Sequence, residues 1–462
     1  MSLNLPGYSL TPSAAKTPLA TNYISDFNFL NQYLPDTYEQ EFERYGNRTI
    51  ASFLRNVSAE IPSASDLIKW SEQGRLHTKY TDCAVVYGAG NDTATVTVTP
   101  SDATVTSCNF RVGQTVFLSS NDNGTSDKAI VTAVSGFDFE VAYYAAAGGT
   151  ISAADTVTAF VYGSEFAKGT TGMEGSLEAQ FQSFEVKPVI IKDKYAVSGS
   201  DMAQIGWVEV ATENGGSGYL WYMKSEHETR LRFEDQLEMM MVEHESAETG
   251  SGAAAYFGTA NAGSQGMFAA IRDRGNIWSA GNPTTLGDFD TVVERLDKQG
   301  AIAENTLFVD RQFSFDIDDM LAAQNSYGSN GTSYGLFDND KDMALNLGFT
   351  GFRRGYDFYK TDWKYLNAAD LRGGITGGKV NGVLVPAGTT SVYDEVIGKN
   401  MKRPFLHIRY RANEAEDRKM KTWITGSAGG ATNSSLDAME VHFLSERALC
   451  TLGANNFVIF ED

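Results

Sequence analysis

Five histidines are the side chains best suited to acid–base or metal chemistry, and they are scattered along the chain. They are His77, His227, His244, His407 and His442. None has the short spacing to another ligand that a zinc site needs. His244 falls near the end of a predicted helix, where a histidine also complements the negative end of the helix dipole. The histidines therefore predict no catalytic or metal site.

An acidic run formed by Asp338, Asp340 and Asp342 begins as a calcium-binding loop does. The pattern then fails, because Met343 stands where the loop needs glycine and Phe349 where it needs a bidentate glutamate. A solvated acidic loop explains the run better than an ion site.

Three cysteines, Cys83, Cys108 and Cys450, are too few and too widely spaced for a disulfide framework. They form no metal pair either. The glycine clusters at 215–218 and 426–430 lack the strand, helix and lysine of a phosphate cradle. We expect no catalytic, metal or cofactor site and interpret these clusters as turns or hinges.

Length and composition indicate a folded protein of two or three compact units. The chain has 462 residues, 42% of them hydrophobic and 21% charged, close to the globular average. No basic and apolar leader opens it, and no stretch reaches the roughly 18 apolar residues of a membrane span. The net charge of −21 repels phosphate backbones, which disfavours direct nucleic-acid recognition.

The N-terminal segment, residues 1–45, is predicted to be an arm without its own core. Ser, Thr, Asn and Pro dominate its first 34 residues, and a short helix follows over 37–45. A few apolar side chains in the arm need a surface to cover them, which a neighbouring chain would supply. They include Phe27, Phe29, Leu30 and Tyr33, with Leu34 beside them.

Composition changes sharply over residues 82–166, which are dense in Thr, Val, Ala and Gly. Short alternating runs at 94–100, 115–120, 129–134, 137–144 and 156–163 predict the strands of a small all-β module. Turn residues at 121–124 and 148–149 favour hairpins.

Two polar, extended runs flank this module, at 66–80 and 181–197. We interpret them as the arms of one long hairpin that carries the module as an insert. A hairpin this polar has little core of its own and needs a partner. Its expected contacts with other subunits are Trp70, Arg75, Phe181, Phe184, Val186 and Lys187.

The strongest helix pattern runs over 219–246. At 3.6 residues per turn one face collects apolar side chains, and Glu226–Arg230 and Glu228–Arg232 are expected to pair elsewhere. Apolar residues expected on that face are Tyr219, Leu220, Met223, Leu231, Leu237, Met241 and Val242. At about 1.5 Å per residue, the rod would be roughly 40 Å long.

Helices and strands alternate in the remainder, which predicts an α+β fold. Helices are expected at 285–299, capped by Thr285 and stopped by Gly300, and at 313–324. Strands are expected at 306–310, 382–388, 405–410, 420–426 and within 439–462.

This order resembles the major capsid proteins of tailed phages, the family named after phage Hong Kong ninety-seven. The stretch 285–322, TLGDFDTVVERLDKQGAIAENTLFVDRQFSFDIDDMLA, is similar to the helix, strand and helix of that family's axial domain. The resemblance implies an N-terminal arm, an extended hairpin, a spine helix, and peripheral and axial domains, with the all-β insert as an addition. The implied parts are an arm (1–45), the peripheral start and outgoing hairpin arm (46–81), the insert (82–166), the returning arm (167–200), the peripheral domain with spine helix (201–284), the axial domain (285–400) and the returning C-terminal strands (401–462).

The resemblance also implies a function in assembly and no catalysis. Hexamers and pentamers of one chain would build an icosahedral shell around phage DNA in the bacterial cytoplasm, with portal, scaffolding and decoration proteins as further partners and no membrane. No charged scaffold segment of the family's fused kind opens this chain, and we expect the insert on the outer face. Two alternatives stay open: another virion or surface-layer component, such as a tail or decoration protein, and a cytoplasmic enzyme with a pocket near His77 or Glu243.

Overall fold

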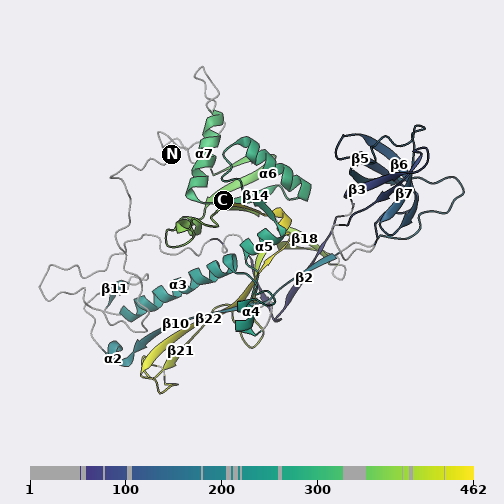
Figure 1. Ribbon diagram of the computed structural model, residues 1–462. Coiled ribbons are helices and arrows are strands. Elements are labelled where there is room, and N and C mark those ends of the chain that lie inside the picture. Colours follow the sequence, from purple (N-terminus) through teal and green to yellow (C-terminus); the bar gives the residue numbers. More distant parts are fainter. Residues whose placement is uncertain are drawn as a thin grey trace. The chain divides into compact units, whose positions relative to one another are not determined.

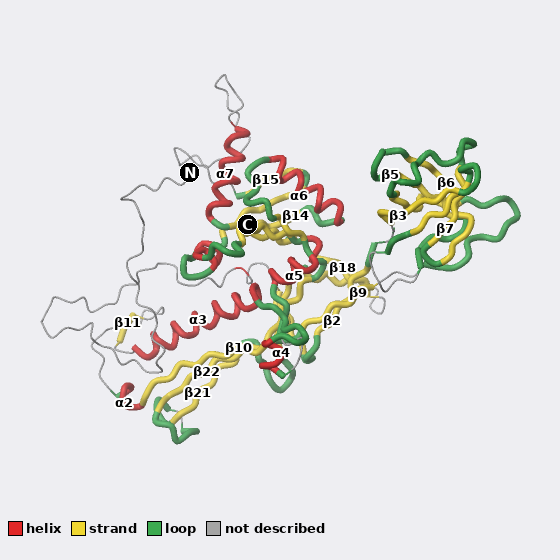
Figure 2. The backbone as a smooth tube through the Cα atoms, viewed as in Figure 1, coloured by secondary structure: helices red, strands yellow, loops and turns green. Residues whose placement is uncertain are grey.

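The computed structural model describes residues 53, 59–75, 77, 79–100, 107–177, 181–203, 210–211, 217–218, 221–258, 263–325, 350–387, 389–394, 399–430 and 432–462. They form two compact units of mixed α and β structure (Figures 1 and 2). The smaller unit spans residues 70–184, and the larger unit contains the described residues up to 69 and from 185 onward. The predicted α+β class is confirmed.

The smaller unit is a closed six-stranded barrel with the strand order β3-β4-β7-β6-β5-β8. All of its neighbouring strands are antiparallel. Its strands are β3 (Lys79–Tyr87), β4 (Thr93–Thr97), β5 (Gln114–Ser120), β6 (Ser126–Ser135), β7 (Asp138–Tyr143) and β8 (Val157–Ser164). Alternate side chains fill the interior, among them Val85, Val96, Leu118, Phe139 and Val141. The five strands predicted from alternation are confirmed.

The two predicted turns of the barrel differ in outcome. Residues 121–125 connect the paired strands β5 and β6, with Gly124 in the left-handed region. The predicted hairpin at Gly148-Gly149 is wrong, because β7 and β8 are not neighbours in the barrel. Gly148 instead has φ +72°, and a Cβ there would lie 2.4 Å from the carbonyl oxygen of Asn91. This close approach explains the glycine.

The first sheet of the larger unit is organised around one long strand, β22 (Ala438–Thr451). β10 (Val189–Ser198) pairs with one end of β22, and β21 (Lys421–Gly426) and β20 (Leu406–Arg411) also pair with it, all three antiparallel. β1 (Ala59–Ser63) extends the sheet beside β20 in parallel. The predicted strands at 405–410 and 420–426 are thereby confirmed.

Helix α3 (Trp221–Glu243) packs on β10 and β22 of this sheet (Figure 2). The contact is a cluster of apolar side chains from all three elements: Tyr195, Val197, Phe233, Leu237, Met439, Val441 and Phe443. The helix predicted over 219–246 is confirmed with shorter ends. Its ion pairs differ from those expected, since Arg230 pairs with Glu234 and Glu228 with Lys224.

The second sheet of the larger unit has six strands in the order β13-β23-β17-β14-β16-β15. They are β13 (Asn276–Trp278), β14 (Glu304–Val309), β15 (Gly351–Arg354), β16 (Tyr356–Asp362), β17 (Val380–Pro386) and β23 (Val458–Glu461). Helices α6 (Leu286–Gln299) and α7 (Arg311–Asn325) contribute Phe289 and Phe313 to the core on one face. α5 (Met267–Arg274) contributes Phe268 to the other core. β17 is buried on both faces, which explains the continuous apolar run of Val383, Leu384 and Val385 within it.

The predicted ends of α6 are confirmed. Thr285 caps the helix in a capping box with Asp288, and Gly300 ends it in the left-handed conformation. The remaining elements are β2 (Ile68–Gln73), β9 (Phe181–Val186), α2 (Gly199–Met202), β11 (Val210–Ala211), β12 (Ser217–Gly218), α4 (Gly252–Phe257), α8 (Lys364–Asn367), η1 (Arg372–Gly374), β18 (Thr389–Asp394), β19 (Lys399–Pro404) and η2 (Ala454–Asn456). Among the helices that the structure describes, none is both long and apolar enough to span a bilayer.

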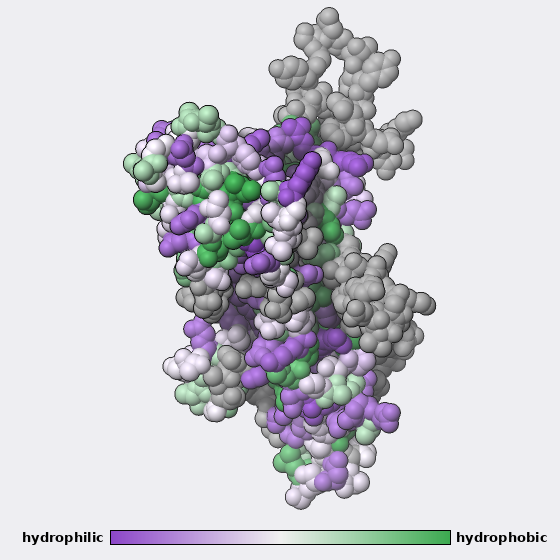
Figure 3. Space-filling view, turned by 90° about the vertical axis from the view of Figure 1, so that its right-hand side faces the viewer, coloured by the Kyte–Doolittle hydropathy of each residue, from purple (hydrophilic) through white to green (hydrophobic). Residues whose placement is uncertain are grey.

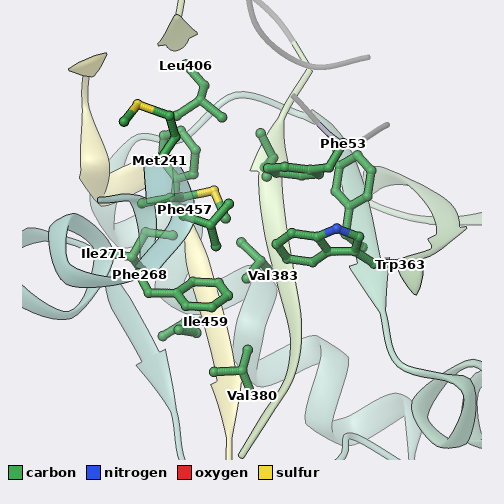
Figure 4. Close-up of a cluster of buried hydrophobic side chains, with 14 of the residues drawn as sticks. Phe53, Met241, Phe268, Ile271, Trp363, Val380, Val383, Leu406, Phe457 and Ile459 are labelled. Carbon is green, nitrogen blue, oxygen red and sulfur yellow. The ribbon is translucent and has the colours of Figure 1, made fainter. Parts of the chain in front are cut away.

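Phe53 is a central contact residue in the core of the larger unit (Figure 4). Its ring stacks on Trp363 at 4.3 Å between centroids and meets Phe308 edge-on at 4.5 Å. Its backbone N–H donates to Oε1 of Glu238, a buried residue of α3. One residue thus connects α3, β14 and the segment after β16.

We predict that Phe53→Ala lowers the free energy of unfolding of the larger unit by about 3–5 kcal/mol, because it removes a fully packed ring and leaves a cavity. Denaturant unfolding of the unassembled chain, followed by tryptophan fluorescence, measures it. Phe315→Ala is the matched control, because Phe315 is 51% exposed and its loss should change stability by less than about 0.5 kcal/mol. Equal effects of the two substitutions would contradict this account.

Candidate subunit interface

No metal-binding group is assembled in the described part of the chain. Among those residues, no three His, Cys, Asp or Glu side chains lie together as ligands. His442 stacks on Trp423 at 5.0 Å, and burial lowers the pKa of His244. The Asp338–Asp342 run lies outside the described residues. The sequence also contains a Gly-x-Ser-x-Gly stretch at 331–335, and this stretch lies outside the described residues too.

None of the three cysteines forms a disulfide bond, and all three are buried. Desolvation raises the pKa of Cys83 to about 11 and also raises the pKa of Cys108. A raised thiol pKa means that little thiolate, the reactive form, exists at neutral pH.

We therefore predict that the native chain does not react with a chromogenic disulfide reagent at pH 8, and that three thiols react after denaturation. The physical reason is that pH 8 lies below the raised pKa values of Cys83 and Cys108 and that all three cysteines are buried away from the reagent. Absorbance of the released thiolate gives the count. Rapid reaction of one thiol in the native state would show an accessible, activated cysteine.

The predicted hairpin exists as a two-stranded ribbon of β2 and β9 that leads the chain into and out of the barrel unit. Trp70 and Phe184 face each other across it, with ring centroids 6.0 Å apart. Lys69 Nζ lies 2.9 Å from Glu185 Oε2, and this hydrogen bond lowers the pKa of the exposed Glu185 carboxyl. The prediction that the ribbon continues to residue 197 is wrong, because 189–198 forms β10 and pairs with β22.

The other predicted contact residues fall in different surroundings. Arg75 is exposed and Lys187 is half-buried, so both are accessible. Val186 is only 5% exposed and is covered within its own chain. Phe181 lies in β9, but its side chain is outside the described residues, as are Phe27, Phe29, Leu30 and Tyr33.

Sequence reasoning missed the most exposed pair of adjacent aromatic residues in the described part of the larger unit. Tyr256 is 85% and Phe257 60% exposed, on the short helix α4, and their rings meet edge-on at 5.1 Å. Ile190 and Ile424 are further exposed apolar residues, on β10 and β21. The available signal was an aromatic pair within a glycine- and alanine-rich stretch.

The C-terminal end of α3 is fixed by a half-buried polar contact. The Arg372 guanidinium holds both carboxylate oxygens of Glu243, at 2.6 and 2.7 Å, and Tyr365 donates to the same carboxylate at 2.7 Å. This bidentate pair raises the pKa of Arg372, and burial together with the bond to Glu243 raises the pKa of Tyr365. The guanidinium also lies over the Phe268 ring. The contact therefore joins α3 to α5, α8 and η1.

No family model and no curated protein matches this sequence. Solved structures do. A chain in the asymmetric unit of the bacteriophage PhiM1 mature capsid is 8% identical with a TM-score of 0.40, covering 97% of this chain and 98% of its own. A chain of the capsid of an empty GTA particle is 7% identical with a TM-score of 0.39, and the alignment covers 91% of this chain and 99% of that one. A Mycobacterium phage Ogopogo chain is 11% identical with a TM-score of 0.41, and the alignment covers 93% of this chain and 97% of that one. Each of these alignments covers more than nine-tenths of this chain. At such low identity its role is inferred from its own elements.

Proposed function

We propose that this chain is a major capsid protein, whose hexamers and pentamers form an icosahedral shell around phage DNA. The observation that carries the proposal is the order of its elements. A ribbon (β2 and β9) carrying an inserted barrel precedes a 23-residue helix on a sheet, a helix-strand-helix unit over 286–325, and C-terminal strands that return to both sheets. The resemblance inferred from the sequence requires this order.

Each part of the described chain then has a role. α3 is the spine helix, and the sheet around β22 belongs to the peripheral domain. The six-stranded sheet with α6 and α7 belongs to the axial domain. We propose that β2 and β9 are the hairpin arms around the insert and that β10 belongs to the peripheral sheet, and we otherwise retain the domain limits proposed from the sequence.

Contacts between copies of the chain are the proposed basis of assembly. The ribbon residues Trp70, Arg75, Phe184 and Lys187 have accessible side chains, and Tyr256 and Phe257 add a large apolar surface. Arm residues Phe27, Phe29, Leu30 and Tyr33, together with Phe181 of the ribbon, are proposed to complete the interface. Val186 would support the ribbon from within its own subunit. Burial gains about 25 cal/mol per Å² of apolar surface before ordering costs, so several modest contacts per subunit stabilise a closed shell.

The net charge of −21 supports a container and not a DNA-binding wall. Binding to a DNA backbone starts from clustered Lys and Arg, whereas an excess of negative charge repels packed DNA. The proposed location is the virion, with assembly in the bacterial cytoplasm, and portal, scaffolding and decoration proteins as further partners.

We predict that electron microscopy of the purified full-length chain shows hexameric rings or hollow shells. The double substitution Tyr256→Ser and Phe257→Ser should abolish them and leave a folded subunit, because it removes apolar contact area without touching the core. Ala255→Ser is the matched control on the same exposed helix and should assemble as the parent does. A parent chain that stays monomeric at all concentrations would overturn the proposal.

We further predict that replacing residues 79–164 by a short Gly/Ser linker spares folding of the larger unit. The first and last strands of the barrel, β3 and β8, are paired neighbours, so the ends to be joined lie close together. If the insert stabilises the shell from outside, the variant shells should dissociate at a lower denaturant concentration than the parent. Light scattering measures dissociation and circular dichroism measures folding. An unfolded product would show that the insert is needed for the core.

A further inference from the structure

The barrel unit contains a pocket of about 430 Å³ that shell assembly does not explain. This volume falls within the range of small-molecule sites. It is lined by His77, Tyr80, Asn109, Phe110, Arg111, Gln114, Val161, Tyr162, Gly163, Ser164, Met173 and Leu177, all from the smaller unit. Hydrophobic side chains also gather on the surface of this unit, shown green in the upper part of Figure 3.

Arg111 is held in place at the pocket with part of its guanidinium unused. Its Nη1 donates to the carbonyl oxygen of Gly175 at 2.9 Å, and its backbone N–H donates to Gln114 Oε1 at 2.8 Å. Its Nε–H is buried without a hydrogen-bond partner among the described residues. Apart from the Nη1 bond, no acceptor within the described residues meets the guanidinium, which leaves its positive charge available to a ligand in the pocket.

The charge of the lining favours an anionic ligand. Residues 70–184 contain twelve Asp and Glu against five Lys and Arg, yet no lining residue is acidic and Arg111 is a cation. A local positive site in a negative unit favours an anion. The guanidinium fork matches a carboxylate.

The rest of the lining fits a ring that has both apolar faces and hydroxyl groups. Phe110 forms a buried floor that packs against Tyr80 and Phe139, and Tyr162 offers an exposed ring. Gln114 is only 6% exposed, and it brings an amide to the pocket beside Asn109 and Ser164. Aromatic faces with amide and hydroxyl groups at the edge suit a sugar.

We propose that this pocket binds an acidic sugar of the uronate class. Its carboxylate pairs with the accessible edge of the Arg111 guanidinium, and its ring lies against Tyr162. The site belongs to the barrel alone and is independent of the proposed shell function, so either proposal can fail without the other.

The test is saturation-transfer NMR and calorimetry on the intact chain with D-glucuronate, using D-glucose and acetate as probes of the ring and of the carboxylate. We expect glucuronate to bind more tightly than either. Arg111→Gln should weaken glucuronate binding at least about tenfold, the loss expected for a charge-assisted hydrogen bond. Lys168→Gln removes one positive charge outside the lining and should bind as the parent does.

Tyr162→Ala provides a second variant that does not disturb the barrel interior, because Tyr162 is exposed. It should weaken glucuronate binding and leave acetate binding unchanged. Absence of glucuronate binding by the parent would overturn the proposal. Equal binding of glucose would overturn the role of the carboxylate, and equal binding of acetate would overturn the role of the sugar ring.

Discussion

The pairing of the C-terminal segment with both sheets is the constraint on which the larger unit depends. β22 forms ten residue pairs with β10 on one side and pairs with β20 and β21 on the other. After η2 the chain enters the second sheet as β23, between β13 and β17. Leu449, Phe457 and Ile459 from this segment join Met241 and Val242 of α3 in the central core. The two sheets and the long helix are therefore held by one continuous stretch of chain.

Sequence patterns identified the elements whose side chains alternate or repeat cleanly. The barrel strands β4 to β8 and the helix α6 have strong period-2 and helical patterns with turn or cap residues at their ends. β3 was not predicted, because Asp82 has a positive φ and a register shift between Tyr80 and Cys83 interrupts the alternation. α4, α5 and β13 lie in a glycine- and alanine-rich stretch that carries little periodic signal.

The candidate interface was predictable only in part. The polar character of 181–197 suggested one continuous hairpin arm, but β10 exposes Lys192 and Lys194 on one face while its end buries Tyr195 and Val197 against α3. A half-buried strand and a solvated ribbon look alike when the other strand is distant in sequence. The pocket around Arg111 could not be foreseen either. Its lining comes from four stretches between residues 77 and 177 that are separated in the sequence and come together only when the barrel closes.

The central position of β22 and β23 also constrains how the chain is made. Ile190 pairs with Glu446 and Glu60 with Ile408, so the defining contacts of the first sheet join residues hundreds of positions apart. Such non-local pairing is slow to form, and the first sheet cannot be completed until β22, which ends at Thr451, has left the ribosome. The barrel, whose strands are local, can fold earlier during synthesis. A polypeptide that ends before residue 438 would lack β22, which pairs with β10, β20 and β21, and β23, which lies between β13 and β17, so neither sheet could form completely.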